Sequence, residues 1–125
     1  MFNHVMVGAN DIEASKKFYD ATFSTLGIRP PMAQGDRYFY FTKDGTFAIS
    51  KPINGEPACG ANGGTIGFKV DSPEQGDAWH AAGIANGGTS CEDPPGIREG
   101  AMGKMYLAYL RDPSGNKICA IKRMT

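Results

Sequence analysis

Two side chains in this sequence offer the chemistry of a reactive centre: the imidazole of His4 and the thiol of Cys119. Several arrangements of these two catalytic candidates are open. His4 can be a hydrogen-bonding group inside a ligand cavity. It can lower the pKa of Cys119 and create a reactive thiolate, or both residues can bind a soft metal with a borrowed ligand. Cys119 can also be a small apolar residue of the core.

A second group of candidates suits the binding of a planar or anionic small molecule. Arg37, Tyr38 and Tyr40 lie in one β-rich run, and Arg98 lies in the glycine- and proline-rich segment 95–103. Since strand side chains alternate between the faces of a sheet, either Arg37 or the two tyrosines face a given side. Segment 95–103 is predicted to be a flexible loop, a candidate lid in which Arg98 would bind an anion.

The elements that must position these residues form two similar halves. In the first half, a strand at 2–8 leads to a helix capped by Asp11 and closed by Gly27. Two strands at 37–42 and 46–51 follow and form a hairpin.

The second half repeats this order at an offset of 61 residues, so that His4 matches Thr65 and Asp11 matches Ser72. It ends in a hairpin around the tight turn at 112–116. We therefore expect one domain, 1–125, built from module one (1–56) and module two (62–125).

Alternation also predicts which strand residues face away from the helices. Apolar residues such as Val5, Ile66 and Ile118 would face the helices, and the opposite faces of the two sheets would then line a cleft. The residues predicted to face this cleft are His4, Met6, Gly8, Thr65, Gly67, Lys69, Lys117, Cys119 and Ile121.

Composition limits the partners and the compartment. Thirteen basic residues balance thirteen acidic ones, and no basic stripe is present, which argues against a nucleic-acid or anionic-membrane partner. No apolar stretch reaches the ~18 residues of a membrane span, and no signal-peptide pattern is found. With three cysteines and no C-x-x-C pair, we expect reduced thiols in a cytoplasmic protein.

Several segments, taken in order, resemble the vicinal-oxygen-chelate superfamily of glyoxalases, bleomycin-resistance proteins and extradiol dioxygenases. They are Asn3-His4-Val5, segment 15–20 with Leu26-Gly27, Gly64–Phe68, Pro95–Arg98 and Tyr106–Ile118. The resemblance implies an α+β fold of two repeated βαβββ modules, with a cupped, open sheet and helices on its outer face. It also implies a homodimer.

The resemblance further implies a divalent metal held by His, Gln or Glu from the first and last strands of each module. At those positions this sequence has His4, Thr65, Cys119 and Ile49. Ile49 is assigned because it follows the turn glycine Gly45 by the same number of residues as Cys119 follows Gly115. His4 is the best metal ligand among them, and the absence of a carboxylate argues against the usual metal.

We therefore expect a protein that binds a small molecule in the cup through a degenerate metal site and needs no cofactor. The candidate ligand-binding residues are His4, Arg37, Tyr38, Tyr40, Thr65, Arg98 and Cys119. One alternative is a metal-dependent lyase, isomerase or dioxygenase with unusual ligands such as Glu92, Glu99 or a partner residue. A second alternative is an activity based on Cys119.

Overall fold

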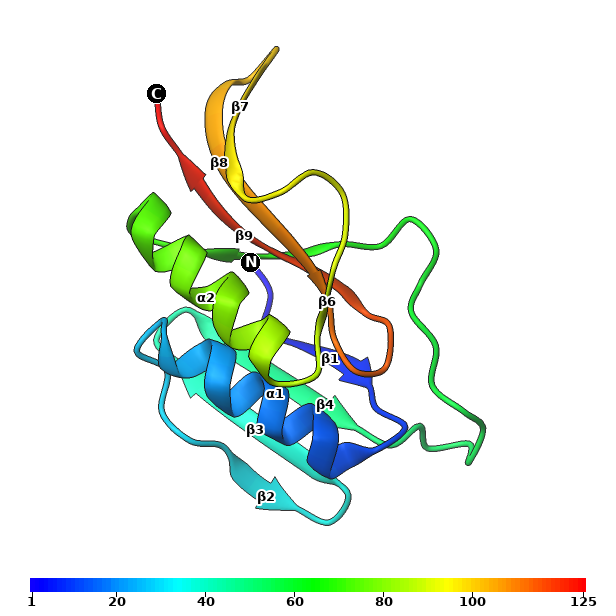
Figure 1. The fold of residues 1–125 in the computed structure, drawn as a ribbon. Coiled ribbons are helices and arrows are strands. Elements are labelled where there is room, and N and C mark those ends of the chain that lie inside the picture. The colour runs from blue at the N-terminus through cyan, green and yellow to red at the C-terminus, as the bar shows by residue number, and fades with distance from the viewer.

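The computed structural model describes residues 1–125 and contains two helices and nine strands (Figure 1). Module one holds β1 (His4–Gly8), α1 (Ile12–Ser24), β2 (Met32–Gln34), β3 (Arg37–Thr42) and β4 (Gly45–Ser50). Module two holds β5 (Ile66–Lys69), α2 (Pro73–Ala85), β6 (Thr89–Ser90), β7 (Gly96–Gly100), β8 (Gly103–Arg111) and β9 (Lys117–Arg123).

Each module builds its own mixed sheet. The first sheet has the order β1-β4-β3-β2, and the second has the order β5-β9-β8-β6, with β7 also paired to β8. In both sheets the first strand runs parallel to the last strand of its module, β1 beside β4 and β5 beside β9. The predicted α+β fold with a cupped sheet is confirmed.

The two helices show the repeat most clearly. Each has 13 residues, and each begins directly after a capping side chain. Asp11 accepts a hydrogen bond from the amide of Ala14, and Ser72 accepts one from the amide of Gln75. These bonds satisfy amide groups that the first turn of a helix leaves free, which is why both helices begin where the sequence predicts.

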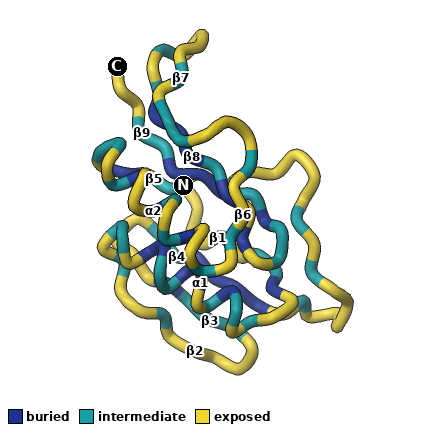
Figure 2. Tube along the Cα trace, in the orientation of Figure 1, coloured by how far each residue is buried: buried dark blue, intermediate teal, exposed yellow.

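One apolar core joins the two modules. In Figure 1, α1 and α2 lie side by side on the same face of the sheets. Phe18 and Phe23 of α1 and Trp79 of α2 are at most 1% exposed and belong to one cluster with the inner residues of both sheets. Figure 2 shows the buried stretches in the central strands and helices, whereas β2 and the connection 52–64 are largely exposed. Neither helix is long and apolar enough to cross a membrane.

Two strands lie where the sequence did not predict them. Segment 32–34 forms the short edge strand β2, all three residues of which are exposed, so no buried alternation marks it. Segment 95–103, predicted to be a flexible loop, contains β7, which pairs with β8 from Gly96 to Gly100. Three glycines favoured the loop prediction, but the hairpin with β8 satisfies the backbone of this segment.

A buried carboxylate ties the turn at 112–116 to module one. Asp112 is 5% exposed and accepts four hydrogen bonds: from the Tyr19 hydroxyl at 2.7 Å, the Ser114 amide, and the Asn116 amide and side chain. Asn116 donates its second side-chain hydrogen bond to the carbonyl of Gly8, at 2.9 Å. Burial, with the neighbouring Asp112 carboxylate, raises the pKa of Tyr19 well above its usual value, so this hydroxyl remains a donor.

Asp112→Asn removes one of the two accepting oxygens without changing the size of the side chain. Since hydrogen bonds to a charged group contribute about 1.5–3 kcal/mol each, we expect the free energy of unfolding in urea to fall by about 2–4 kcal/mol. Asp36→Asn, at an exposed carboxylate with no hydrogen bond, is the matched control and leaves that free energy unchanged. An equal loss of stability in both variants would contradict this role of Asp112.

Candidate functional site: the cup face

The face of each sheet opposite the helices is called the cup face here, and burial defines its residues. On β1, Val5 and Val7 pack against the core, while His4 and Met6 are exposed on the other side. On β5, Ile66 and Phe68 pack against the core, and Gly67 and Lys69 are exposed. Thr65 lies just before β5 and is also exposed. On β9, Ile118 and Ala120 belong to the core, which leaves Lys117, Cys119 and Ile121 on the cup face.

The β3 strand turns its two tyrosines away from the cup. Tyr38 donates a hydrogen bond to Glu13 at 2.6 Å, and Tyr40, fully buried, donates one to Asp20 at 2.7 Å. Both acceptors lie on α1, so these hydroxyls fix the helix to the sheet. Of the two choices that alternation left open, the structure places Arg37 on the cup face and moves the candidates Tyr38 and Tyr40 to the helix side.

Arg37 therefore shares the cup face with two phenylalanines. Its Nε donates to the Ser50 hydroxyl at 3.3 Å, and its terminal nitrogens make no hydrogen bond within the chain. The rings of Phe39 and Phe41 stack with each other on the same face, with centroids 6.2 Å apart and planes inclined by 12°. This part of the cup face combines a guanidinium with flat apolar surface.

The Arg98 guanidinium is already bound by the backbone. Its two terminal nitrogens donate to the carbonyls of Leu107 at 2.7 Å and Asp93 at 2.8 Å, and more weakly to Gly96 and Pro94. The bond to Leu107 ties Arg98 to β8, and the other three bonds fold segment 93–96 around the guanidinium. Arg98 thus orders this segment, and only its Nε is left for an anion.

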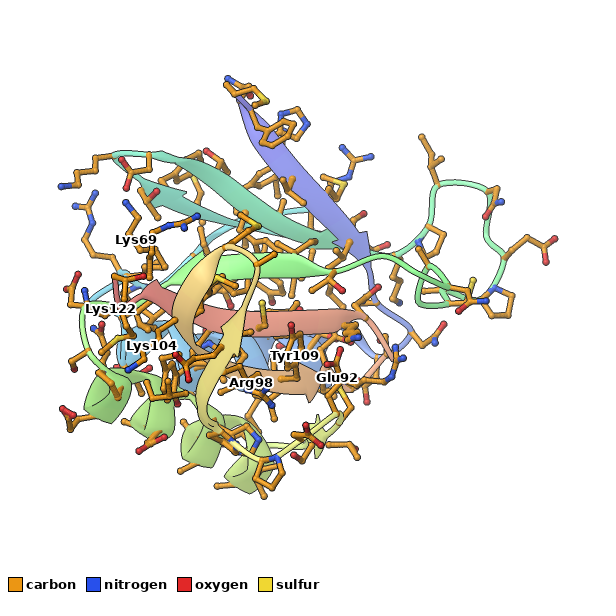
Figure 3. The ribbon with its side chains drawn as sticks, turned by 90° about the horizontal axis from the view of Figure 1, so that it is seen from above. Lys69, Glu92, Arg98, Lys104, Tyr109 and Lys122 are labelled. Carbon is orange, nitrogen blue, oxygen red and sulfur yellow. The ribbon has the colours of Figure 1, made fainter.

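Tyr109 and Lys117 are two further cup-face residues: Lys117 was predicted to face the cleft but was not a candidate for ligand binding, and Tyr109 was not predicted. The Tyr109 ring lies between Arg98 and Lys117, whose charged groups are 5.6 Å and 5.1 Å from its centroid. Lys117 forms an ion pair with Glu92, and Figure 3 shows Arg98, Tyr109 and Glu92 as neighbours. Alternation along β8 could have found Tyr109, because its neighbours Ala108 and Leu110 are core residues.

The electrostatics of this cluster keep its phenol neutral. Partial burial raises the pKa of Tyr109, with contributions from Cys119 and Glu92. The hydrogen bond from Lys117 to Glu92 raises the pKa of that lysine. Glu92 is also the only non-glycine residue with a positive φ, 57°. The cluster presents a protonated hydroxyl and fixed cations.

His4 and Cys119 lie in different settings. His4 is exposed at the start of β1, where its Nδ1 lies 2.7 Å from the side-chain oxygen of Asn3. Cys119 is 4% exposed on β9, which lies inside the second sheet between the edge strand β5 and β8. Burial raises the pKa of Cys119 to about 11, with Glu92 adding to the shift. A reactive thiolate needs the opposite shift.

Comparison with known proteins identifies the fold family. Residues 1–120 match the model of the Glyoxalase/Bleomycin resistance protein/Dioxygenase superfamily. The chain belongs to this superfamily. A search of the curated proteins gave no significant match.

Solved structures agree with this assignment. A glyoxalase/bleomycin resistance protein from Albidiferax ferrireducens T118 is 67% identical to this chain, with a TM-score of 0.96 over 98% of this chain and 99% of that one. A glyoxalase-related enzyme from Fulvimarina pelagi is 19% identical, with a TM-score of 0.74 over 97% and 86% of the two chains. A lactoylglutathione lyase from Agrobacterium tumefaciens is 22% identical, with a TM-score of 0.66 over 97% and 92%. The last two show a shared fold only.

Strand pairing corrects one of the positions at which the family resemblance implies a metal ligand. Cys119 pairs with Gly67, and the module-one equivalent of Gly67 is Met6, which pairs with Ala48. The counterpart of Cys119 is therefore Ala48, whereas Ile49 is fully buried in the core. Counting between the two hairpin glycines was wrong by one residue, which in a strand is a change of face.

The cup-face residues do not fit a divalent metal. The four positions hold His4, Ala48, Thr65 and Cys119, of which one is a strong ligand and none a carboxylate. No group of three or more histidine, cysteine, aspartate or glutamate side chains comes together anywhere in the chain. The alternative ligands are engaged elsewhere, since Glu92 pairs with Lys117 and Glu99 lies 4.0 Å from Lys104.

Thiol labelling tests the setting of Cys119. At about pH 8, Ellman's reagent should modify the exposed Cys59 quickly and leave Cys119 unmodified in the folded protein, because its thiol is buried and protonated. Mass spectrometry of the labelled peptides gives the order of reaction. Cys59→Ser should abolish the fast phase, and Cys119→Ser should leave it intact. Fast labelling of Cys119 would revive a cysteine-based activity.

Proposed function

We propose that this protein binds a planar, anionic small molecule on its cup face and does so without a resident metal or other cofactor. One observation carries the proposal. The positions at which the family resemblance implies metal ligands supply a single imidazole, while the same face presents aromatic rings beside cations. Flat rings and positive charge are the groups that bind a conjugated carboxylate or phenolate.

Each module contributes one part of this face. In module one, Arg37, whose terminal nitrogens make no hydrogen bond within the chain, shares the cup face with the stacked Phe39 and Phe41. In module two, the neutral Tyr109 hydroxyl is a donor next to Lys117. His4 and Thr65 are further exposed polar groups on this face; the Nε2 of His4 and the hydroxyl of Thr65 make no hydrogen bond within the chain.

A second copy of the chain is part of the proposal. The cup face of module one leaves large apolar residues in solvent: Met6 is 40% exposed, Met32 57% and Phe41 46%. Burying such a face contributes roughly 25 cal/mol per Å² of apolar surface, which favours association of two chains. Three unpaired cysteines suit a reducing compartment, so the proposal places the protein in the cytoplasm.

Binding of 1-naphthoate tests the function. Isothermal titration calorimetry of the untagged protein should show saturable binding, and Tyr109→Leu should weaken it about tenfold, because the variant loses both the ring contact and the hydroxyl. Tyr38→Leu makes the same change on the helix side of a sheet and should leave the affinity unchanged. Equal affinities in all three proteins would contradict binding on the cup face.

Metal content supplies the control for this test. Plasma mass spectrometry of protein purified without chelator should find far less than one metal ion per chain, before and after incubation with Zn, Ni, Mn and Fe. A stoichiometry near one that is lost in His4→Ala would contradict the metal-free proposal. It would restore the metal-dependent lyase, isomerase or dioxygenase as the leading alternative.

Sedimentation velocity tests the second copy. Wild-type protein should sediment with twice the 13.4 kDa chain mass, and Met6→Glu should shift it to the monomer, because a charge would be buried in the contact. Met124→Glu, at a methionine 38% exposed near the C-terminus, is the control and should remain dimeric. A monomeric wild type would contradict this part of the proposal.

A further inference from the structure

A second candidate site lies at one end of the seam between the two sheets, and we call it the seam cavity. It measures about 940 Å³ and is lined from module one by the start of β1, the end of α1 and the β3–β4 turn. Residues 66–69 of β5 line it from module two. Asn116 and Gly8 close the opposite end of the seam by their hydrogen bond.

The walls of the seam cavity are mostly different from the cup face. Phe23, Phe47 and Phe68 line it, and these rings face the helices and belong to or contact the core. They meet one another edge to face, with centroids 5.1–5.4 Å apart. The cavity therefore reaches from the surface toward the apolar core, and its volume lies within the range of ordinary ligand sites.

The rim of the seam cavity carries an excess of unpaired positive charge. Arg29, Lys43 and Lys69 line it, all three are exposed, and none of their side chains forms an ion pair or a hydrogen bond. The only acidic residue in the lining is Asp44. In a chain whose net charge is zero, this local excess is selective for an anion.

We propose that the seam cavity binds an anionic amphiphile, a molecule with a flexible apolar body and a terminal carboxylate. The body would lie against the phenylalanine walls, and the carboxylate would lie at the rim between Lys43 and Lys69. The phenylalanine walls favour such a molecule over an inorganic anion, which has no apolar body. The positive charge of the rim favours it over an amine of the same length. This site adjoins the cup face and shares His4, Phe41, Gly67 and Lys69 with it, but its phenylalanine walls Phe23, Phe47 and Phe68 lie on the helix side of the sheets.

Decanoate is the probe, and Trp79 provides the signal. Trp79 is the single tryptophan of the chain, and its ring lies 6.5 Å from that of Phe68, which lines the cavity. Decanoate, kept below its micelle concentration, should change the Trp79 fluorescence in a saturable way with one site per chain. Decylammonium should bind at least about tenfold more weakly, because its charge has the wrong sign.

Charge reversal at the rim separates a specific site from apolar adsorption. Lys43→Glu and Lys69→Glu should each weaken decanoate binding about tenfold and should strengthen the binding of decylammonium. Lys17→Glu makes the same charge change at an exposed lysine outside the cavity lining and should leave both affinities unchanged. If decanoate binds equally well to all four proteins, or does not bind at all, the proposal is wrong.

Amide chemical shifts place the ligand in one site or the other. In a ¹⁵N-labelled protein, decanoate should shift the amide signals of Gly27 and Gly45, which line the cavity away from the cup face, and spare those of Gly60 and Gly88. Shifts centred on Tyr109 and Lys117 would put decanoate on the cup face, which would overturn this inference and support the proposed function. A change in sedimentation on Lys43→Glu without a change in affinity would assign the cavity to a contact between copies and also overturn it.

Discussion

The relation between the two modules depends on a buried carboxylate. Asp112 accepts a hydrogen bond from Tyr19, in module one, and from the backbone and side chain of Asn116, which in turn bonds the carbonyl of Gly8. A carboxylate can be buried at 5% exposure only if its lone pairs are satisfied, and four donors meet this requirement. The donors come from a helix, a turn and an amide side chain, so the network holds only when both modules are in place.

This constraint fixes one end of the seam between the sheets and leaves the other end free. No strand pairing links β1 to β5 at any point, and the side-chain hydrogen bond from Asn116 to the carbonyl of Gly8 joins the modules at the end of β1. The seam cavity lies at the other end, at the start of β1. The hydrogen bond between Asn116 and Gly8 thus holds the modules together at one end of the seam, and the seam cavity reaches the core from the other end.

Local sequence signals predicted both helices, but they did not predict which face of β3 points toward the helices. Asp11 and Ser72 cap their helices because each side chain binds an amide of its own first turn, which the sequence shows directly. The face of β3 was undecided because both of its alternating sets contain aromatic residues. Only the acceptors Glu13 and Asp20 on α1 settle that Tyr38 and Tyr40 point to the helix. Arg98 orders its segment by binding carbonyls of residues 93–96 and of β8, which the β7–β8 pairing brings together. The glycines of this segment favoured a loop, so the pairing was not predicted.

The charge on the cup face also disfavours a divalent metal. Arg37, Lys69 and Lys117 lie on this face, with the Arg98 guanidinium over Tyr109, and Glu92 is the carboxylate that accompanies them. A divalent cation there would be repelled by these groups, and at an effective dielectric constant of about 20 two unit charges 4 Å apart already interact by about 4 kcal/mol. Carboxylate ligands would offset that repulsion, but the ligand positions hold Ala48, Thr65 and Cys119. The positive charge that disfavours a divalent cation is favourable for an anion, so the ligand positions without carboxylates and the cations on this face both agree with the proposed ligand.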